Sequence, residues 1–221
     1  MGLNVIMMGP PGAGKGTQAA RFADGRGVPK ISTGDILREM ARDGHPTAVD
    51  AKARIDSGEL VDDATMIEIV RERLMRPDAQ RGFVLDGFPR TVAQAEALDR
   101  IVDERKQGPL IVVDVAVPEE ELVRRLAMRR ICVACGVDAD PSVVGDRCAK
   151  CGGALEQRSD DNEAVVRERL SVYRRSTKPV LEFYRKRPTF RVVNGAQPRE
   201  QVARELDAMI DDAASVKAES L

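Results

Sequence analysis

The chain has 221 residues, and 43% of them are apolar, so it can bury a sizeable hydrophobic core with room for small insertions. Acidic and basic residues nearly cancel, 36 against 35, which argues against a protein that coats nucleic acid. No apolar run approaches the ~20 residues that a membrane helix needs, and the stretch Val5–Met8 is too short for a signal peptide and lacks a basic flank. We therefore expect a cytoplasmic protein whose partners are neither nucleic acid nor a membrane.

Short β-rich runs alternate with longer helical patterns along the chain. Strands are expected at 3–9, 28–32, 81–86, 110–117 and 189–193, and helices at 14–24, 62–75, 91–105, 118–130, 161–186 and 198–213. This alternation predicts an α/β fold with a five-stranded parallel sheet that is covered by helices on both faces. Two segments interrupt it: 33–60 is helical without a strand, and 131–157 has weak periodicity and contains all four cysteines. We interpret both as insertions.

A glycine-rich loop, GPPGAGKGT at 9–17, joins the first expected strand to the first helix. It matches the phosphate-binding pattern G-x-x-x-x-G-K in the structural context that the pattern requires. Its glycines allow backbone N–H groups to surround a phosphate, and the helix N-terminus adds a partial positive charge. Lys15 would supply a full charge to the β- and γ-phosphates. The candidate phosphate-binding residues are Gly12, Ala13, Gly14, Lys15, Gly16 and Thr17. The alternative is a simple Gly-Pro turn before a helix, which the match in both position and spacing disfavours.

Gly16 departs from most such loops, which carry Ser or Thr after the lysine to bind Mg²⁺, and Thr17 follows one position later. We expect Mg²⁺ to be held by water and nucleotide oxygens, because this ion keeps several waters in protein sites.

Two further strand ends carry polar motifs: STGDILR at 32–38, and DGFPRT at 86–91 with Gln94 one helical turn later. Ligands of open α/β sheets gather at the carboxyl ends of the strands. Three neighbouring strand ends therefore predict a site for phosphorylated ligands.

Together with QRSDDNE at 157–163, these motifs resemble the adenylate kinase family, and the resemblance spans about 1–210. It implies a P-loop NTPase-type core (1–31, 62–127 and 162–221), a helical insertion that binds the nucleoside monophosphate (32–61) and a lid (128–161). It also implies a monomeric transferase that uses Mg²⁺ to convert ATP and AMP reversibly into two ADP, by in-line displacement with arginine clamps and lid closure.

The resemblance also implies residue roles. AMP would contact Thr33, Arg38, Glu59, Leu60, Val61, Gly87, Phe88, Pro89, Arg90, Gln94, Arg158 and Arg169, with Gln94 recognising adenine. ATP would contact Arg125 and Arg129, one turn apart on a helix, and also Asp138, Ala139 and Gln197. The catalytic groups would be Lys15, Arg90, Arg129, Arg158, Arg169 and Asp86, the last orienting magnesium waters. Phosphoryl transfer depends on positioning and charge neutralisation, which guanidinium groups supply well.

Two alternatives stay open. A UMP/CMP kinase would share the fold, but Thr33, Thr91 and Gln94 favour adenine, since the pyrimidine enzymes tend to carry Asn after Phe-Pro-Arg. A P-loop protein that binds nucleotide without turnover is less compatible with arginines on both sides of the transferring group.

Cys132-x₂-Cys135 and Cys148-x₂-Cys151 are separated by twelve residues, and Gly follows each pair. Two such pairs are typical of a closed, structural Zn²⁺ site, in which the metal replaces a core that this segment cannot build. Two disulfides or a redox pair are weaker alternatives in a chain without a secretion signal. Zinc-bearing adenylate kinases carry such a site in the lid. The sequence at 137–139 lacks the Tyr common there.

Overall fold

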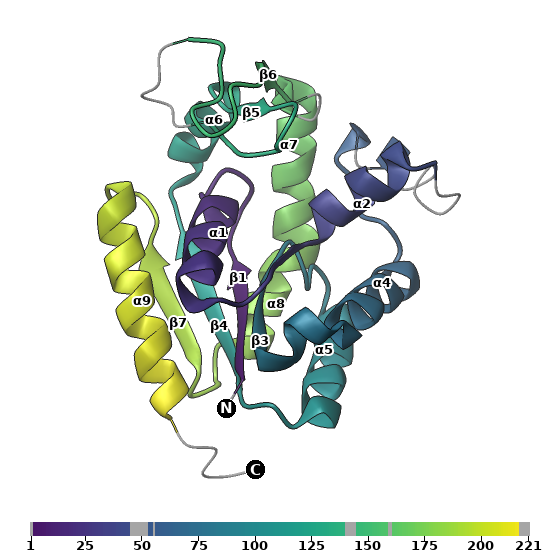
Figure 1. Cartoon of the computed structure of the whole chain (residues 1–221), viewed down its shortest axis with the longest axis vertical. Coiled ribbons are helices and arrows are strands. Elements are labelled where there is room, and N and C mark those ends of the chain that lie inside the picture. Colours follow the sequence, from purple (N-terminus) through teal and green to yellow (C-terminus); the bar gives the residue numbers. More distant parts are fainter. Residues whose placement is uncertain (1, 45–52, 55, 140–144, 159–160, 217–221) are drawn as a thin grey trace.

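The computed structural model describes residues 2–44, 53–54, 56–139, 145–158 and 161–216. Its main sheet has five parallel strands in the order β2-β3-β1-β4-β7 (Figure 1). They are β1 (Leu3–Met8), β2 (Lys30–Ser32), β3 (Gly82–Asp86), β4 (Leu110–Ala116) and β7 (Phe190–Asn194). The predicted fold class and all five predicted strands are confirmed.

Helices cover both faces of this sheet because successive side chains of each strand point to opposite sides. On β1, Val5 and Met7 belong to one buried cluster and Ile6 and Met8 to the other. The first cluster packs against α1 (Lys15–Arg26), α6 (Glu119–Ala127), α7 (Glu163–Val172) and α9 (Arg199–Ser215). The second packs against α2 (Thr33–Arg42), α4 (Asp63–Met75), η1 (Pro77–Arg81), α5 (Val92–Arg105) and α8 (Lys178–Tyr184).

Side-chain caps fix where the helices next to the expected site begin. Ser32 ends β2 and caps α2 by accepting from the Asp35 N–H, and Thr91 caps α5 by accepting from the Gln94 N–H. Such caps satisfy backbone donors that a helix N-terminus leaves unpaired. At the carboxyl edge of the sheet, the motifs that follow β2 and β3 therefore contain the cap residues at which α2 and α5 begin.

Several predicted boundaries are wrong. The helix expected at 118–130 ends at Ala127, so Arg125 and Arg129 do not share a helix. The chain leaves the helix there because β5 (Arg130–Cys132) pairs antiparallel with β6 (Leu155–Gln157), a strand pair that was not predicted. The helix expected at 161–186 consists of α7, the π-helical η3 (Tyr173–Thr177) and α8.

The remaining differences concern the second strand and the first insertion. β2 begins at Lys30 because Pro29 has no N–H for the ladder. The helical character expected for 33–60 is confirmed over α2, whereas 45–52 and 55 lie outside the described residues.

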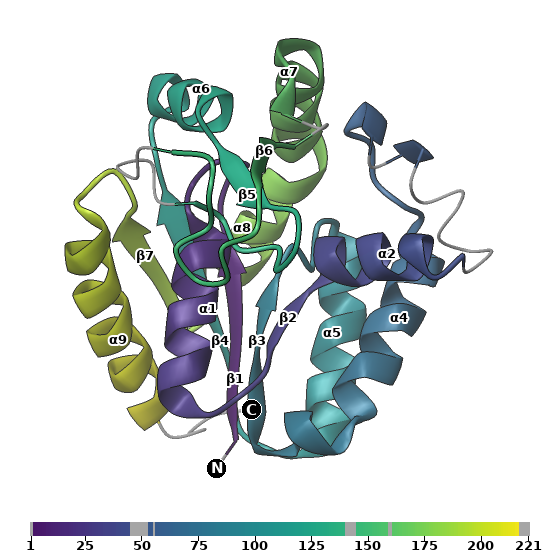
Figure 2. The ribbon, with the colours of Figure 1, turned by 45° about the horizontal axis from the view of Figure 1, so that its top comes forward.

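The described part of the cysteine segment, 131–139 and 145–157, lies beside the carboxyl ends of the main sheet: β5 and β6 are above the loop that follows β1 in Figure 1 and in front of it in Figure 2. Its described buried cluster contains only Cys132, Cys148 and Leu155. Among the described residues, no helix is long and apolar enough to cross a membrane.

Candidate functional site

A cleft of about 510 Å³ lies at the carboxyl edge of the sheet. A second cavity of about 80 Å³ adjoins it, and the two share Arg38, Arg90, Arg158 and Arg169. Among the predicted site residues, the large cleft is lined by Gly12, Ala13, Gly14, Lys15, Gly16, Thr17, Asp86, Phe88, Pro89, Arg125, Arg129, Asp138, Ala139 and Gln197. Thr33, Glu59, Val61 and Gln94 line the small cavity, and Leu60 and Gly87 line both. The structure thus brings together every predicted site residue outside the cysteines.

The glycine-rich loop forms the floor of the large cleft. Gly12 has φ 84°, in the left-handed region that favours glycine, and a Cβ there would lie 2.9 Å from Leu126 Cγ of α6. Glycine therefore lets α6 pack against the loop. Lys15 is the first residue of α1, and its Nζ donates to the Pro10 carbonyl at 2.8 Å, which holds the ammonium over the loop.

The pKa of Lys15 is lowered to about 8, mainly because the surrounding protein removes water from the ammonium. The neighbouring guanidinium groups of Arg90, Arg169 and Arg129 lower it further, and the Asp86 carboxylate opposes them. Such a concentration of positive charge in a cleft is suited to a polyanion, whose binding would relieve the repulsion.

Gly16 leaves space between two carboxylates. A Cβ at Gly16 would lie 3.1 Å from Asp86 Oδ2 and 3.9 Å from Asp138 Oδ2, so β3 and the cysteine segment both bring an oxygen to this position. The Lys30 ammonium also lies 3.8 Å from this position. Carboxylate oxygens and water are ligands that Mg²⁺ accepts. The donor set fits magnesium.

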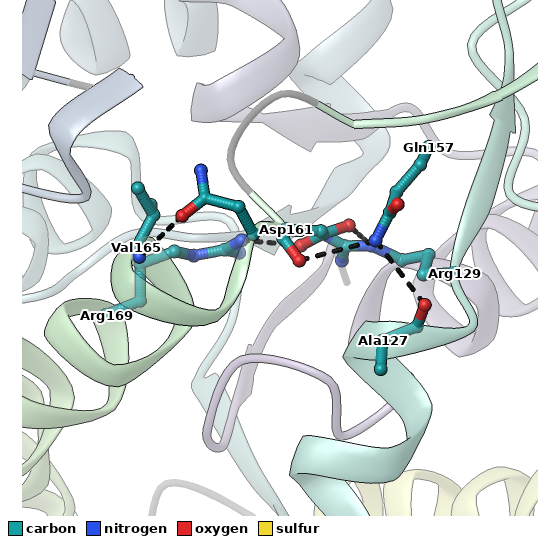
Figure 3. A network of polar contacts seen from close by, with 7 residues as sticks. Ala127, Arg129, Gln157, Asp161, Val165 and Arg169 are labelled. Atoms are coloured by element: carbon teal, nitrogen blue, oxygen red, sulfur yellow. Dashed lines mark hydrogen bonds and ion pairs between the residues drawn. The ribbon is translucent and has the colours of Figure 1, made fainter.

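Two arginines are held by one buried acid (Figure 3). Asp161 is 2% exposed and accepts from Arg129 Nε and Nη2, both at 2.7 Å, and from Arg169 Nη1 at 2.9 Å. Arg129 and Arg169 approach it from opposite sides, the first from the chain after α6 and the second from α7. Arg129 does not share a helix with Arg125, so its side chain is oriented by its hydrogen bonds to Asp161.

The small cavity has its own hydrogen-bond framework. The Gly87 carbonyl accepts from Thr33 Oγ1 at 2.9 Å and from Arg90 Nε at 2.7 Å. The Arg90 backbone N–H donates to Gln94 Oε1 at 2.8 Å. Arg38 pairs with Asp35 one turn before it on α2. The ends of β2 and β3 are thus joined through side chains that face the cavity.

Arg125 and Gln197 lie at the far end of the large cleft, next to the end of β7. Arg125 Nη1 donates to the Gly195 carbonyl at 3.0 Å, and its Nε donates to Glu121 at 2.8 Å. Gln197 Nε2 donates to Glu205 of α9 at 2.8 Å. These contacts connect α6 to the loop after β7.

The four cysteines form a candidate metal centre. Their Sγ atoms all lie within 4.8 Å of one another, and none is in a disulfide. The pKa of Cys132 is lowered, mainly because the backbone N–H of Cys135 donates to its sulfur, which favours the thiolate that binds metals. The group could hold a metal ion such as Zn²⁺.

Sequence reasoning missed two acids. Asp161 stands inside a quoted motif, but only the fold shows that it contacts both arginines. Asp63 accepts from Gln94 Nε2 at 2.8 Å and from Thr91 Oγ1 at 2.9 Å. Its position in the first turn of α4, beside the cap Asp62, does not distinguish it in the sequence from an ordinary helix-start acid.

Comparison with known proteins agrees with this geometry. The model of the adenylate kinase family matches residues 7–189. The adenylate kinase of Archaeoglobus fulgidus is 47% identical over 213 residues, which cover 95% of this chain and 98% of that protein. The adenylate kinase of Geobacillus sp. (strain WCH70) is 48% identical over 204 residues, 90% and 94% of the two chains. The chain belongs to the adenylate kinase family of nucleoside monophosphate kinases.

Proposed function

We propose that the chain transfers a phosphoryl group reversibly between ATP and AMP, in a magnesium-dependent reaction that forms two ADP. The observation that carries this proposal is the pair of adjoining cavities that share four arginines. One cavity has a phosphate loop as its floor, and the other has the strand-end motifs of β2 and β3. Two nucleotides bound there would meet through their phosphates at the shared arginines.

ATP would occupy the large cleft, with its adenine near Arg125 and Gln197 and its triphosphate along the loop toward Lys15. AMP would occupy the small cavity, with its base at Gln94 and its phosphate at Arg38 and Arg90. The backbone from Glu59 to Val61 would line the base, as the lining of the small cavity supports.

An oxygen of the AMP phosphate would attack the γ-phosphorus, a new P–O bond would form, and the bond from the γ-phosphorus to the β-phosphate oxygen would break in line, leaving ADP on each side. Lys15, Arg90, Arg129, Arg158 and Arg169 would neutralise the charge on the transferring group. Asp161 would keep Arg129 and Arg169 oriented before the substrates bind.

Magnesium, when bound, would supply positive charge that offsets the negative charge of the nucleotide phosphates. Asp86 would hold its waters, with Asp138 nearby. The closeness of both carboxylates to Gly16 supports this arrangement.

We further propose that 32–61 and 128–161 act as bodies that close over the two nucleotides, with 1–31, 62–127 and 162–221 as the core. Closure would exclude water, a competing phosphoryl acceptor. A Zn²⁺ ion on the four thiolates would be structural, because a closed four-sulfur site has no position open for substrate. A monomer would suffice, since one chain supplies every residue of the proposed site.

A coupled assay of ADP formation tests the proposal. ATP with AMP should give rapid ADP formation, whereas ATP with UMP or CMP should give little, and ATP alone should give almost none. Failure to form ADP from ATP and AMP would overturn the enzyme assignment and favour a protein that only binds nucleotide. Preference for UMP or CMP would favour the pyrimidine kinase.

A further inference from the structure

The side-chain amide of Gln94 is fixed at both ends. Gln94 is 2% exposed and lines the small cavity. Its Oε1 accepts from the Arg90 backbone N–H, and its Nε2 donates to Asp63 Oδ1, each at 2.8 Å. A backbone N–H can only donate and a carboxylate can only accept, so these partners determine which end of the amide is oxygen and which is nitrogen.

Asp63 is itself held in place. It is the first residue of α4, and its second oxygen, Oδ2, accepts from Thr91 Oγ1 at 2.9 Å. Thr91 is the cap of α5, where its Oγ1 accepts from the Gln94 backbone N–H at 3.2 Å. Asp63, Thr91 and Gln94 thus form a closed ring of hydrogen bonds between α4 and α5. The carboxylate cannot rotate away without breaking this ring.

Each end of the fixed amide keeps one unused capacity, a second hydrogen on Nε2 and a second lone pair on Oε1. A base in the small cavity must therefore offer an acceptor beside a donor. Adenine does so, because its 6-amino group lies beside a ring nitrogen that accepts. A 6-oxopurine has an accepting oxygen at position 6 and a hydrogen on N1. It would therefore place an acceptor against Oε1 and a donor against Nε2, and neither pair can form a hydrogen bond. A flipped amide would match it instead.

We propose that Asp63 is a positioning residue that makes the site prefer 6-aminopurine over 6-oxopurine monophosphates, by preventing the Gln94 amide from flipping. This inference rests on the proposed function, in which the monophosphate base lies at Gln94. Removing the carboxylate leaves, among the described residues, the Arg90 N–H as the one hydrogen bond that opposes the flip.

The test measures affinities of AMP and inosine monophosphate for the whole protein by calorimetry. The native chain should prefer AMP. Asp63→Ala should reduce that preference about tenfold, the effect of roughly one hydrogen bond. In Asp63→Asn the single oxygen can accept from Thr91 or from Gln94 but not from both, so this variant should also lower the preference for AMP. Asp62→Ala is the matched control: it removes the neighbouring carboxylate, which accepts from the Thr65 N–H at 2.9 Å, and should lower the Tm without changing the preference.

An equal loss of affinity for both nucleotides in Asp63→Ala would overturn the inference, as would an equal change of preference in Asp62→Ala. If Asp63→Ala does not fold, Thr91→Val releases one oxygen of the carboxylate and should lower the preference about threefold; an unchanged preference there contradicts the inference. A native chain without preference for AMP overturns the proposed base site as well. A preference that survives in Asp63→Ala overturns the role of Asp63 alone.

Discussion

The floor of the cleft and the cysteine segment are held by different means. The floor follows β1, whose residues Val5 and Ile6 are completely buried between two large apolar clusters. The described cluster of the cysteine segment has three members, two of which are thiols. The floor therefore depends on buried apolar area, whereas we propose that the segment depends on a metal held by its four cysteines. This difference means that catalysis and segment stability should respond to separate perturbations.

Arg90→Ala should have the largest effect on catalysis, because Arg90 lines both cavities and would neutralise the transferring group. We expect kcat to fall by about 10³-fold, or about 4 kcal/mol of transition-state stabilisation. Steady-state kinetics measure it. Arg100→Ala on the exposed face of α5 is the control and should turn over normally. Normal kcat in Arg90→Ala would refute the assignment.

Removing the metal from the cysteines should lower the Tm by several degrees and leave turnover intact at temperatures where the fold persists. The reason is that the four thiolates would stabilise a segment with little core of its own. Chelation or Cys148→Ser, followed by calorimetry and initial rates, tests this, with Ala149→Ser as the matched control. Loss of activity in a fully folded, metal-free protein would mean that the metal takes part in the chemistry.

Asp161→Asn should separate arginine positioning from folding. Asn offers one oxygen where Asp161 accepts three hydrogen bonds from two arginines. We expect kcat to fall about 30-fold, for roughly 2 kcal/mol, with a smaller change in KM. Asp207→Asn, which breaks the exposed pair with Arg21, should leave kcat unchanged. An unchanged kcat in Asp161→Asn would show that the carboxylate of Asp161 is not needed to orient Arg129 and Arg169.

The smallest expected effect comes from the titration of Lys15, which should be seen as proton uptake when a nucleotide binds. Its pKa of about 8 in the free protein means that it loses charge as pH rises through 8, so nucleotide affinity should decline between pH 7 and 9. A bound phosphate favours the ammonium and raises this pKa, so binding at pH 8 should take up about half a proton. Calorimetry in buffers of different ionisation enthalpy measures the uptake. Lys15→Met should abolish it, and equal uptake in that variant would exclude Lys15 as the source.

The sequence predicted the elements that follow local rules and missed those that depend on pairing across the chain. The strand-end motifs and the cysteine pairs are short patterns, so their place at the sheet edge and in one cluster could be predicted. The end of α6 at Ala127 depends on β5 pairing with β6 more than twenty residues later in the chain. Asp161 and Asp63 gain their contacts only when α6, α7, α4 and α5 come together, and no local pattern distinguishes them from surface or capping acids.

The most direct test of the central claim is a crystal structure with a two-substrate analogue, two adenosines joined by five phosphates. We predict one adenosine next to Arg125 and Gln197, the other at Gln94, and the phosphate chain running from Lys15 across the four shared arginines. An analogue with either adenosine outside these two cavities, or with its phosphates away from Arg90, would contradict the account.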